Sequence, residues 1–468
     1  MESKLSTANS LNIRLVSETM VRPAADTKEG TLFLTNIDHL LMFYAQTIYV
    51  YPHVSEAESK DVIEILRNAL AKVLVPFNFM AGRLRMNDDE ERLEVHCNRA
   101  GVLFSHAETE IIIADMGTLD FLNPLLPRLT ADLQLTDQLS DCPLMILKVT
   151  KFRCGGFIVG LSIIHALLDG QSGDIFMNQF ASISRGDGLT ALPYLNKEAL
   201  RARDPPRPIY EHPEFMKASV LQAFMANSDP NDLTSPQALW PLSKNQWKSF
   251  SFCTKFINYL QSKALEDESL VKKCSKFDVL AAYLWQARTK ALDMSPNQVS
   301  QLMFAVDFRQ RFNPPLPKEL IGNAVATSCI RTSANKIINS PLSFCVKQIQ
   351  DAKGKITEAY VRSTIDWLQL NKGSILSASG GIIISSWSRF ITSRMNLGWG
   401  APAYSGPVFH GEQLKNFVIL LPKKQQEESI FHVYLALEEH QMDKFTQIYQ
   451  TSCEMAELDR NVCMQCRL

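Results

Sequence analysis

Two β-prone segments that end at a histidine constrain the fold of this chain more than any other feature. Residues 144–152 and 157–164 are rich in apolar and β-branched side chains, and paired glycines at positions 155 and 156 separate them. This pattern predicts a β-hairpin. From about residue 173 to 184 the apolar positions instead recur at helical spacing. The run His165-Ala-Leu-Leu-Asp169-Gly170 therefore lies where a buried strand ends and a helix follows.

The rest of the chain alternates between strand and helix patterns after a polar region, residues 1–30, that is predicted to be irregular. Helices are predicted at residues 61–75, 277–292, 341–365 with a break near Gly354, and 441–450. Strands are predicted at residues 31–36, 45–51, 92–98, 102–107, 302–307, 381–387, 417–421 and 431–436. This alternation, together with the hairpin, predicts the α/β class with a mixed sheet, α+β in character.

The length of 468 residues predicts two domains. The stretch Arg201-Ala-Arg-Asp-Pro205-Pro206-Arg-Pro208 is rich in proline and charge, which favours an extended linker. We therefore expect an N-terminal domain at residues 1–190, a crossover linker at 191–215 and a C-terminal domain at 216–468.

Composition excludes several classes of function. Hydrophobic residues make up 46% of the chain, and the net charge of −1 does not fit a nucleic-acid binder. No apolar run reaches the roughly 18–20 residues of a membrane span, and no secretory signal is recognisable. The ten cysteines are scattered, which predicts free thiols in the cytoplasm. Cys463 and Cys466 lack the second pair of a metal site, so no metal is predicted.

His165 is the strongest candidate for chemistry. A neutral imidazole at the end of a strand is a good general base near pH 7. Asp169 either orients this imidazole or turns away and anchors the loop to a cation, and Gly170 permits a sharp turn. The spacing His-x-x-x-Asp is nevertheless common by chance, and a histidine at a strand end is more often a satisfied polar group.

A set of further segments occurs in a characteristic order along nearly the whole chain. They are Ala81-Gly-Arg-Leu84, Val149–Phe157 leading into His165–Gly170, Ser275-Lys-Phe-Asp278, Leu284–Thr289, Val306–Arg311, Pro314-Pro-Leu-Pro317 with Gly322-Asn323, Ser385-Ser-Trp387 and Leu397-Gly-Trp-Gly400. With this ordered set the chain resembles the plant BAHD acyltransferases, which depend on coenzyme A (CoA) and share their fold with chloramphenicol acetyltransferase.

The resemblance implies two acetyltransferase-like domains around a central channel, in a protein expected to be monomeric. Acyl-CoA would be a co-substrate, with no permanently bound cofactor, and a small-molecule alcohol or amine would be the acceptor. His165 would remove the acceptor's proton, and the resulting oxyanion needs donors. Trp399 and the hydroxyl of Ser385 are the implied residues near that centre. Packing for Trp399 and a strand-end role for Ser385 are the alternatives.

The resemblance also assigns supporting residues. Asp169 would face away from the substrate and form a structural ion pair with Arg309. Ser275 and Lys276 would line the CoA side, where a hydroxyl and a cation suit phosphate oxygens, together with Gly398 and Gly400. Ser275 is equally suited to cap a helix.

Several positions depart from the family pattern. Ile164 replaces a second histidine, and Leu167 and Leu168 replace smaller residues, which is expected to narrow the pocket. Asn396 and Leu397 stand where Asp-Phe is usual, and Ile321 where an aromatic residue is common before Gly322. Asn396 loses a charge but still accepts hydrogen bonds. These changes put the loop on the CoA side in question rather than the base.

Within the family, the texture is nearest to hydroxycinnamoyl transferases that act on ω-hydroxy fatty acids and fatty alcohols, such as ω-hydroxypalmitate O-feruloyl transferase. Taxane and shikimate acyltransferases share several of the same cues, so acceptor identity and O- versus N-acylation stay open. One rival hypothesis is a catalytically reduced family member that acts as a binding partner in lipid elongation. A second is a condensation domain of peptide synthesis, for which the chain has no room for carrier-protein neighbours.

Overall fold

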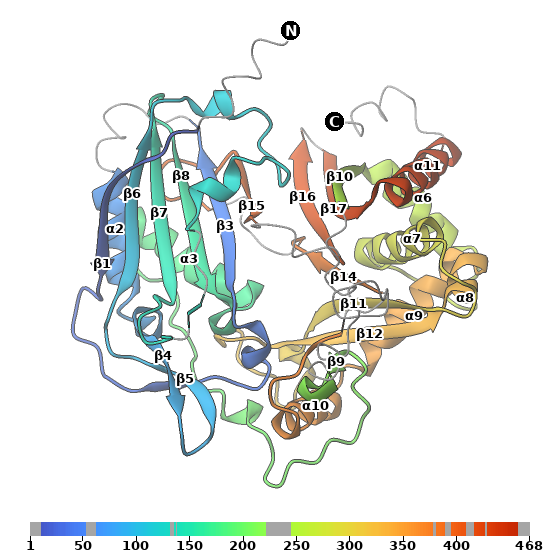
Figure 1. The fold of residues 1–468 in the computed structure, drawn as a ribbon, viewed down its shortest axis with the longest axis horizontal. Helices are drawn as coiled ribbons and strands as arrows, with labels where there is room; N and C mark the ends of the chain where they lie inside the picture. Colours follow the sequence, from blue (N-terminus) through green and yellow to red (C-terminus); the bar gives the residue numbers. More distant parts are fainter. Residues whose placement is uncertain are drawn as a thin grey trace. The chain divides into compact units, whose positions relative to one another are not determined.

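A computed structural model of the chain describes residues 11–52, 62–131, 135–136, 138–220, 245–377, 381–388, 395–408, 416–425 and 428–456. The chain divides into two compact units, coloured along the sequence in Figure 1. The first unit comprises Met1–Arg201, Leu316–Ala324 and Phe390–Gly411, and the second comprises Ala202–Pro315, Val325–Arg389 and Glu412–Leu468.

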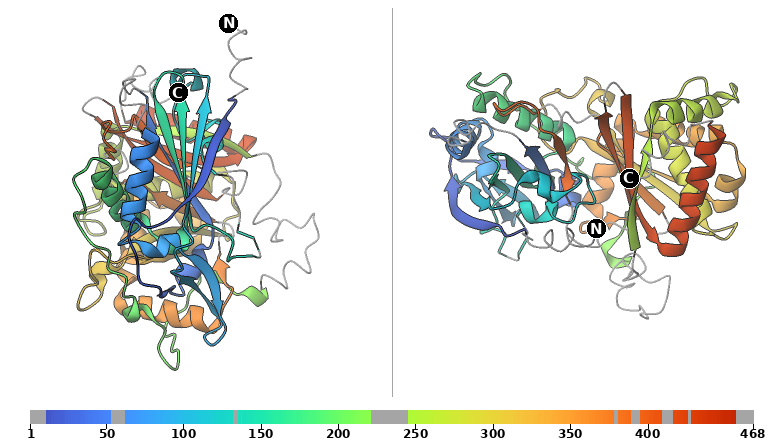
Figure 2. Two further views of the ribbon diagram at one scale, coloured as in Figure 1. Left: turned by 90° about the vertical axis from the view of Figure 1, so that its left-hand side faces the viewer. Right: turned by 90° about the horizontal axis from the view of Figure 1, so that it is seen from above.

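The first unit is built on a mixed sheet in which six strands are described. Their order is β1 (Arg14–Val21), β6 (Val102–Thr109), β7 (Met145–Phe152), β8 (Phe157–Ile164), β3 (Tyr44–Tyr51) and β15 (Tyr404–Val408). Only β6 and β7 pair in parallel. A smaller sheet has the order β2 (Thr31–Phe33), β5 (Arg92–His96) and β4 (Arg83–Asn87). Helices α2 (Val62–Val73) and α3 (Gly170–Ser184) pack together, and Figure 2 shows α2 against one face of the large sheet.

Strand β8, which leads into the histidine, is the most completely buried strand of this sheet. All eight of its residues are buried, as the unbroken apolar run requires. Gly160 is needed because a Cβ there would lie 2.1 Å from the carbonyl oxygen of Leu129. In the turn before the strand, Gly155 has a φ of 82°, which glycine adopts without strain. The predicted hairpin is therefore confirmed, and β8 holds its C-terminal end rigidly.

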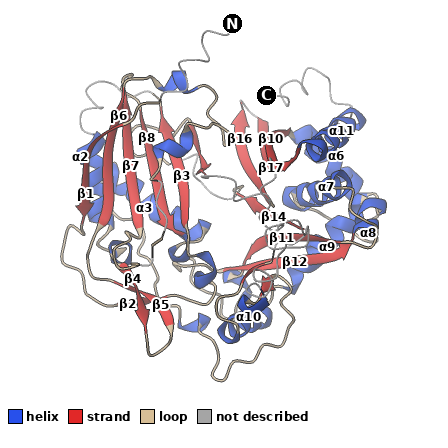
Figure 3. Ribbon diagram, viewed as in Figure 1, coloured by secondary structure: helices blue, strands red, loops and turns tan. Residues whose placement is uncertain are grey.

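The second unit also contains a mixed sheet, whose strands are red in Figure 3. Six strands of this sheet are described. Its order is β10 (Asn245–Phe252), β17 (Glu428–Glu438), β16 (Phe417–Gln425), β14 (Gly381–Ser386), β11 (Val299–Asp307) and β12 (Val325–Ser333). Strands β9 (Phe215–Met216) and β13 (Ile375–Leu376) form a separate pair. The helices are α6 (Thr254–Leu265), α7 (Lys276–Ala291), α8 (Ala334–Asn339), α9 (Leu342–Lys355), α10 (Glu358–Leu370) and α11 (Glu439–Met455). Helix α7 packs against α6, α9 and α11.

The proline-rich segment after residue 201 is fastened to α10 rather than loose. Asp366 accepts hydrogen bonds from the backbone N–H groups of Arg203 and Arg207 and pairs with the Arg203 side chain at 2.6 Å. Ser363 accepts from the N–H groups of Ile209 and Tyr210. An extended segment that does not pair with a neighbouring strand leaves its backbone N–H groups without acceptors. Here the side chains of two buried helix residues, Ser363 and Asp366, accept those hydrogen bonds.

The α/β mixed-sheet class is thus confirmed, while three details of the prediction need correction. Residues 14–21 form β1 instead of irregular chain, an edge strand whose mostly exposed side chains hide the strand pattern. Helix α3 begins at Gly170 because Asp169 caps it, three residues earlier than expected. The units are also not contiguous: residues 316–324 and the Asn396–Gly400 loop, expected in the C-terminal domain, pack with the first unit.

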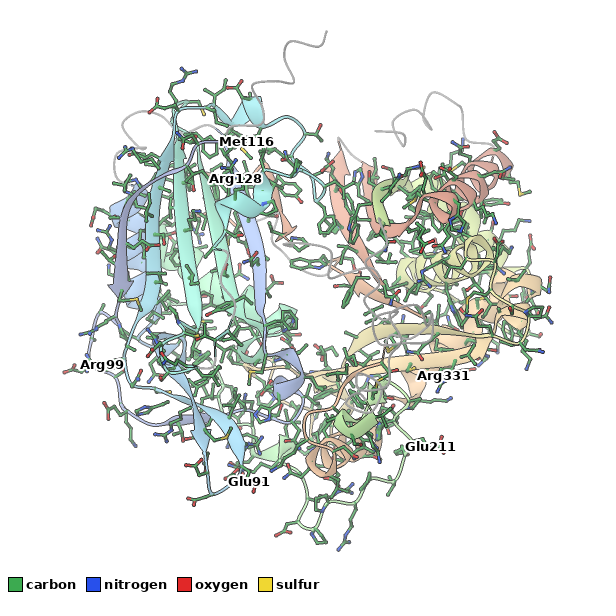
Figure 4. All side chains as sticks on the ribbon, in the orientation of Figure 1. Glu91, Arg99, Met116, Arg128, Glu211 and Arg331 are labelled. Atoms are coloured by element: carbon green, nitrogen blue, oxygen red, sulfur yellow. The ribbon has the colours of Figure 1, made fainter. Side chains whose placement is uncertain are left out.

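Figure 4 shows side chains filling the space between helices and sheet in each unit. It also labels Glu91 at the tip of the β4–β5 hairpin, where φ is 48°. The loop that carries His165 follows β8 directly: it begins with η5 (His165–Leu167), which packs against η1 (Asp38–Leu41), and both are short 3₁₀ turns.

Candidate active site

His165 is the first residue after β8 and opens η5. Its backbone N–H donates to the carbonyl oxygen of Phe43 at 2.8 Å, so the neighbouring strand fixes its position. The imidazole lies 5.4 Å from the ring of Phe43, which is 49% exposed. Burial lowers the pKa of His165 below its usual value, although its own carbonyl, Asp169 and Asn323 act in the opposite direction. The ring is therefore neutral at pH 7, as a general base must be.

Asp169 supports the loop that carries His165. Its Oδ1 accepts from the N–H of Ser172 at 2.8 Å, which caps α3, and its Oδ2 accepts from the N–H of Ala324 at 3.0 Å. The side chain is almost completely buried. Asp169 thus joins the start of a helix to a segment more than 150 residues away, which is a structural role.

The segment at residues 316–324, which we call the strap, lies along this loop. Ser172 donates through its hydroxyl to the carbonyl oxygens of Leu320 and Gly322, at 3.2 and 3.0 Å. The N–H of Asp169 in turn donates to the oxygen of Gly322. The side chain of Asn323 donates to the carbonyl oxygen of His165 at 2.9 Å. The strap therefore contacts the histidine as well as the aspartate.

A buried ion pair lies next to the strap, and the sequence patterns did not identify it. Lys197 and Asp38 are 2.8 Å apart, with side chains 1% and 0% exposed. Burial opposes ionisation of Asp38, but Lys197 and hydrogen bonds from Asn323 and Thr35 outweigh it and lower the pKa of this carboxyl. The backbone N–H of Thr35 donates to the Asp38 carboxylate, and the backbone N–H of Asp38 donates to the hydroxyl oxygen of Thr35. The spacing Thr-x-x-Asp was the available signal, since it is that of a capping box.

Asn396, which stands where an aspartate is usual, holds the loop that contains Trp399. Oδ1 of Asn396 accepts from the N–H groups of Gly398 and Gly400, both at 2.9 Å. Its backbone oxygen accepts from Arg185 at 2.5 Å. Both glycines have positive φ values, 118° and 83°, which suit the tight turn. Asn396 thus closes the loop without a carboxylate.

Trp399 packs on the start of β8, at the opposite end of this strand from His165. Its ring meets Phe157 edge-on, with centroids 5.2 Å apart, and Phe157 stacks on Tyr51 at 4.8 Å. The hydroxyl of Tyr51 donates to the carbonyl oxygen of Met395 at 2.7 Å. The loop and the histidine strand are therefore rigidly connected within the first unit, with Trp399 half-buried.

The other implied residues belong to the second unit. Ser275 caps α7, in a capping box with Asp278, and Ser275 and Lys276 are both exposed. Ser385 lies near the end of β14 and is half-buried. Arg309 is buried and pairs with Asp307 at 2.9 Å. The implied Asp169–Arg309 pair stays a prediction.

The apolar residues that depart from the family pattern pack in the core of the first unit. Ile164, Leu167 and Ile321 are completely buried there, and Leu168 is nearly so. Their larger or different side chains are therefore accommodated by apolar packing.

Other functional groups are sparse in the described part of the chain. Eight cysteines in it are free thiols, and it contains no cluster of three or more His, Cys, Asp or Glu side chains arranged to hold a metal ion. Cys463 and Cys466 lie outside the described residues. None of the described helices combines the length and the apolar character that crossing a membrane demands.

Comparisons with known proteins agree with this architecture. The family model described as "Transferase family" matches residues 11–451. Omega-hydroxypalmitate O-feruloyl transferase of Arabidopsis thaliana is 32% identical over 438 residues, 93% of this chain and 92% of that protein. Shikimate O-hydroxycinnamoyltransferase of Nicotiana tabacum is 30% identical, over 90% of this chain and 96% of that protein.

Among solved structures, vinorine synthase superposes with a TM-score of 0.69 at 19% identity, covering 92% of this chain and 96% of that one. The two-unit architecture with a mixed sheet in each unit is thus that of an acyltransferase fold. The chain belongs to the Transferase family, that is, to the BAHD acyltransferases, and is an acyltransferase that transfers groups other than aminoacyl groups.

Proposed function

We propose that this protein transfers an acyl group from a CoA thioester to a hydroxyl group, with Nε2 of His165 as the general base. The observation that carries the proposal is the position of His165, which directly follows a fully buried strand and is half-buried rather than enclosed. Burial also lowers the pKa of His165, which favours the neutral ring that a base needs. The family membership supports acyl transfer as the reaction.

In the proposed reaction, Nε2 of His165 removes the proton from the hydroxyl group of the alcohol substrate. The hydroxyl oxygen attacks the carbonyl carbon of the thioester at the same time. The carbon–sulfur bond of the tetrahedral intermediate then breaks. The CoA thiolate leaves and takes the proton from the imidazolium, so that an ester and free CoA are formed. Ser385 is the proposed oxyanion residue, because a hydroxyl can donate to a developing negative charge. Trp399, whose ring packs at the start of β8, is proposed as a pocket-wall residue only.

For CoA we propose the start of α7 in the second unit. Ser275 and Lys276 are exposed there, beside the positive end of a 16-residue helix, where phosphate groups bind favourably. Gly398 and Gly400 are proposed to border the same co-substrate from their loop. No permanently bound cofactor is needed for these steps.

A hydroxycinnamoyl donor and an ω-hydroxy fatty acid or fatty alcohol acceptor are the proposed substrates. The name of the Arabidopsis relative reports feruloyl transfer to ω-hydroxypalmitate. In this chain the exposed ring of Phe43 beside His165 supports a planar aromatic acyl group, because aromatic rings stack favourably. The altered residues Asn396 and Leu397 favour the rival function as a binding partner. The hydrogen bonds that Asn396 accepts from Gly398 and Gly400 keep the loop closed, which supports the catalytic function instead.

Release of free CoA thiol tests this proposal. Wild-type protein is incubated with feruloyl-, caffeoyl- and acetyl-CoA against ω-hydroxy fatty acids, fatty alcohols, shikimate and polyamines. We expect release with a long-chain hydroxy acceptor, and His165→Ala to lower kcat by about 10²–10⁴-fold. His106→Ala, in β6 of the same unit, is the control and should keep the rate. Equal rates for wild type and His165→Ala, or no release across the panel, would overturn the proposal.

A further inference from the structure

The most informative feature beyond the proposed reaction is a pair of buried polar atoms that lack partners next to the base. Nδ1 of His165 and Oδ1 of Asn323 are both buried, and neither has a hydrogen-bond partner in the described part of the chain. The two residues touch, since Nδ2 of Asn323 donates to the carbonyl oxygen of His165 at 2.9 Å. One atom is an acceptor and the other can be a donor.

The surroundings determine which way the Asn323 amide faces. Its Nδ2 donates both to Oδ1 of Asp38 and to the carbonyl oxygen of His165, each at 2.9 Å. Both partners are acceptors only, so the amide cannot be turned round without losing two hydrogen bonds. Oδ1 is therefore the atom of this amide that is left without a partner.

Asp38 in turn holds Asn323 through a carboxylate with four hydrogen bonds. Oδ1 accepts from the backbone N–H and the side chain of Asn323, at 3.0 and 2.9 Å. Oδ2 accepts from the N–H of Thr35 at 2.7 Å and from Lys197 at 2.8 Å. Lys197 keeps this buried carboxylate charged, so it acts as an acceptor toward Asn323.

Gly322 brings the strap close enough for this arrangement. A Cβ at this position would lie 3.0 Å from Cδ and 3.2 Å from Nζ of Lys197, and its φ is 134°. A buried ion pair is often no more stabilising than apolar packing. Because Asp38 accepts hydrogen bonds from both the backbone and the side chain of Asn323, the ion pair is better placed to orient Asn323 than to stabilise the fold.

We propose that Asn323, held by the Asp38–Lys197 pair, positions the His165 imidazole with its proton on Nδ1, so that Nε2 is free to act as the base. The hydrogen bond at one ring nitrogen determines which tautomer is present. Asn323 is thus a positioning residue, as are Asp38 and Lys197 behind it. This inference rests on the proposed general-base role of His165. Charged groups that act on the imidazole are Asp169, from the same loop, and Asp38, from η1.

The Asn323→Ala variant separates positioning from mere structural support. Asn323→Ala removes the acceptor, so we expect kcat to fall about tenfold or more with KM changed less than twofold. The acidic limb of the pH–kcat profile should move to lower pH, since a bond to Nδ1–H favours the charged ring. In Asn323→Asp the new carboxyl group would face the Asp38 carboxylate and the carbonyl oxygen of His165, so kcat and the free energy of unfolding should fall together. Lys197→Met should lower kcat in the same way as Asn323→Ala, but less.

Asn123→Ala is the matched control. Asn123 is also a buried asparagine of the first unit, and its amide donates to the carbonyl oxygens of Met116 and Thr118. Its loss should reduce stability and leave the pH profile and kcat unchanged. If Asn323→Ala behaves like this control, with an unmoved acidic limb, the positioning role is wrong.

The tautomer can be measured without any activity. In protein labelled with ¹⁵N-histidine, with His165→Ala used for assignment, the imidazole of His165 should show a protonated Nδ1 and an unprotonated Nε2 at pH 8. A protonated Nε2 would overturn the inference. Failure of all acyl transfer by the wild type would instead refute the proposed function and leave this measurement of the ring intact.

Discussion

Several histidines of this protein have a carboxylate close by in the sequence, and two of them, His165 and His212, lie in opposite surroundings. His212, in the second unit, bonds Glu214 through Nδ1 and the hydroxyl of Ser363 through Nε2, both at 2.9 Å. It is completely enclosed, with the rings of Phe215, Tyr360 and Trp367 around it. His165 is instead half-buried, so its ring is not enclosed by protein on every side.

The contrast shows that a Ser–His–carboxylate geometry is not by itself an active site. The hydroxyl of Ser363 already accepts two backbone N–H bonds from the crossover segment, so the group fastens this segment to α10. A base needs a ring nitrogen that substrate can reach. His165 should therefore matter for rate and little for stability, and His212 the reverse.

The largest expected effect on stability is that of His212→Ala. The substitution takes one hydrogen bond each from Glu214 and Ser363, which keep bonds from Tyr360 and from the N–H groups of Ile209 and Tyr210. Each lost bond costs about 0.5–1.5 kcal/mol, and the cavity left among the surrounding rings adds to this loss. The free energy of unfolding, measured with urea, should fall by about 2–4 kcal/mol. His165→Ala should cost less than about 1 kcal/mol. Equal losses for the two variants would break the comparison.

Asp169→Ala should come next, because Asp169 supports the histidine loop rather than the reaction. Loss of the α3 cap costs about 0.5–2 kcal/mol, and the N–H of Ala324 loses its acceptor at a cost of about 1–3 kcal/mol. We expect a loss of about 2–4 kcal/mol in urea unfolding, and kcat should fall because the loop shifts. Asp169→Asn keeps the acceptor for Ser172 and should lose clearly less stability than Asp169→Ala. An Asp169→Ala protein of wild-type stability would contradict the role of the carboxylate.

The smallest expected effect concerns Asn396, the altered residue of the Trp399 loop. Asn396→Asp restores the more common residue and keeps an acceptor for Gly398 and Gly400, so stability should change by less than about 0.5 kcal/mol and kcat by less than twofold. Asn396→Ala removes both hydrogen bonds and should raise the KM for acyl-CoA several-fold. A large gain in activity with Asn396→Asp would show that the asparagine limits this enzyme.

Local patterns predicted the strand, the hairpin and the position of His165, because the unbroken apolar run of β8 by itself indicates a buried strand. They could not predict the strap, since nothing in residues 316–324 by itself indicates that they pack with the first unit. The partners in the network behind His165 are far apart in the chain: Lys197 lies 159 positions from Asp38, and Asn323 lies 285 positions from it. Such long-range pairs are determined by tertiary contacts rather than by periodicity. The cap formed by Asp169 also extended α3 beyond its apolar pattern.

The pH dependence of kcat/KM with an alcohol acceptor tests the central claim most directly. Burial lowers the pKa of His165 below its usual 6.5, and the base is active only when it is neutral. Activity should therefore be maintained as pH falls to 6.5 and be lost as it passes through a lower value. The residual rate of His165→Ala should lack this acidic limb. An identical limb in His165→Ala, or a wild-type midpoint above 6.5, would contradict the assignment of His165 as the base.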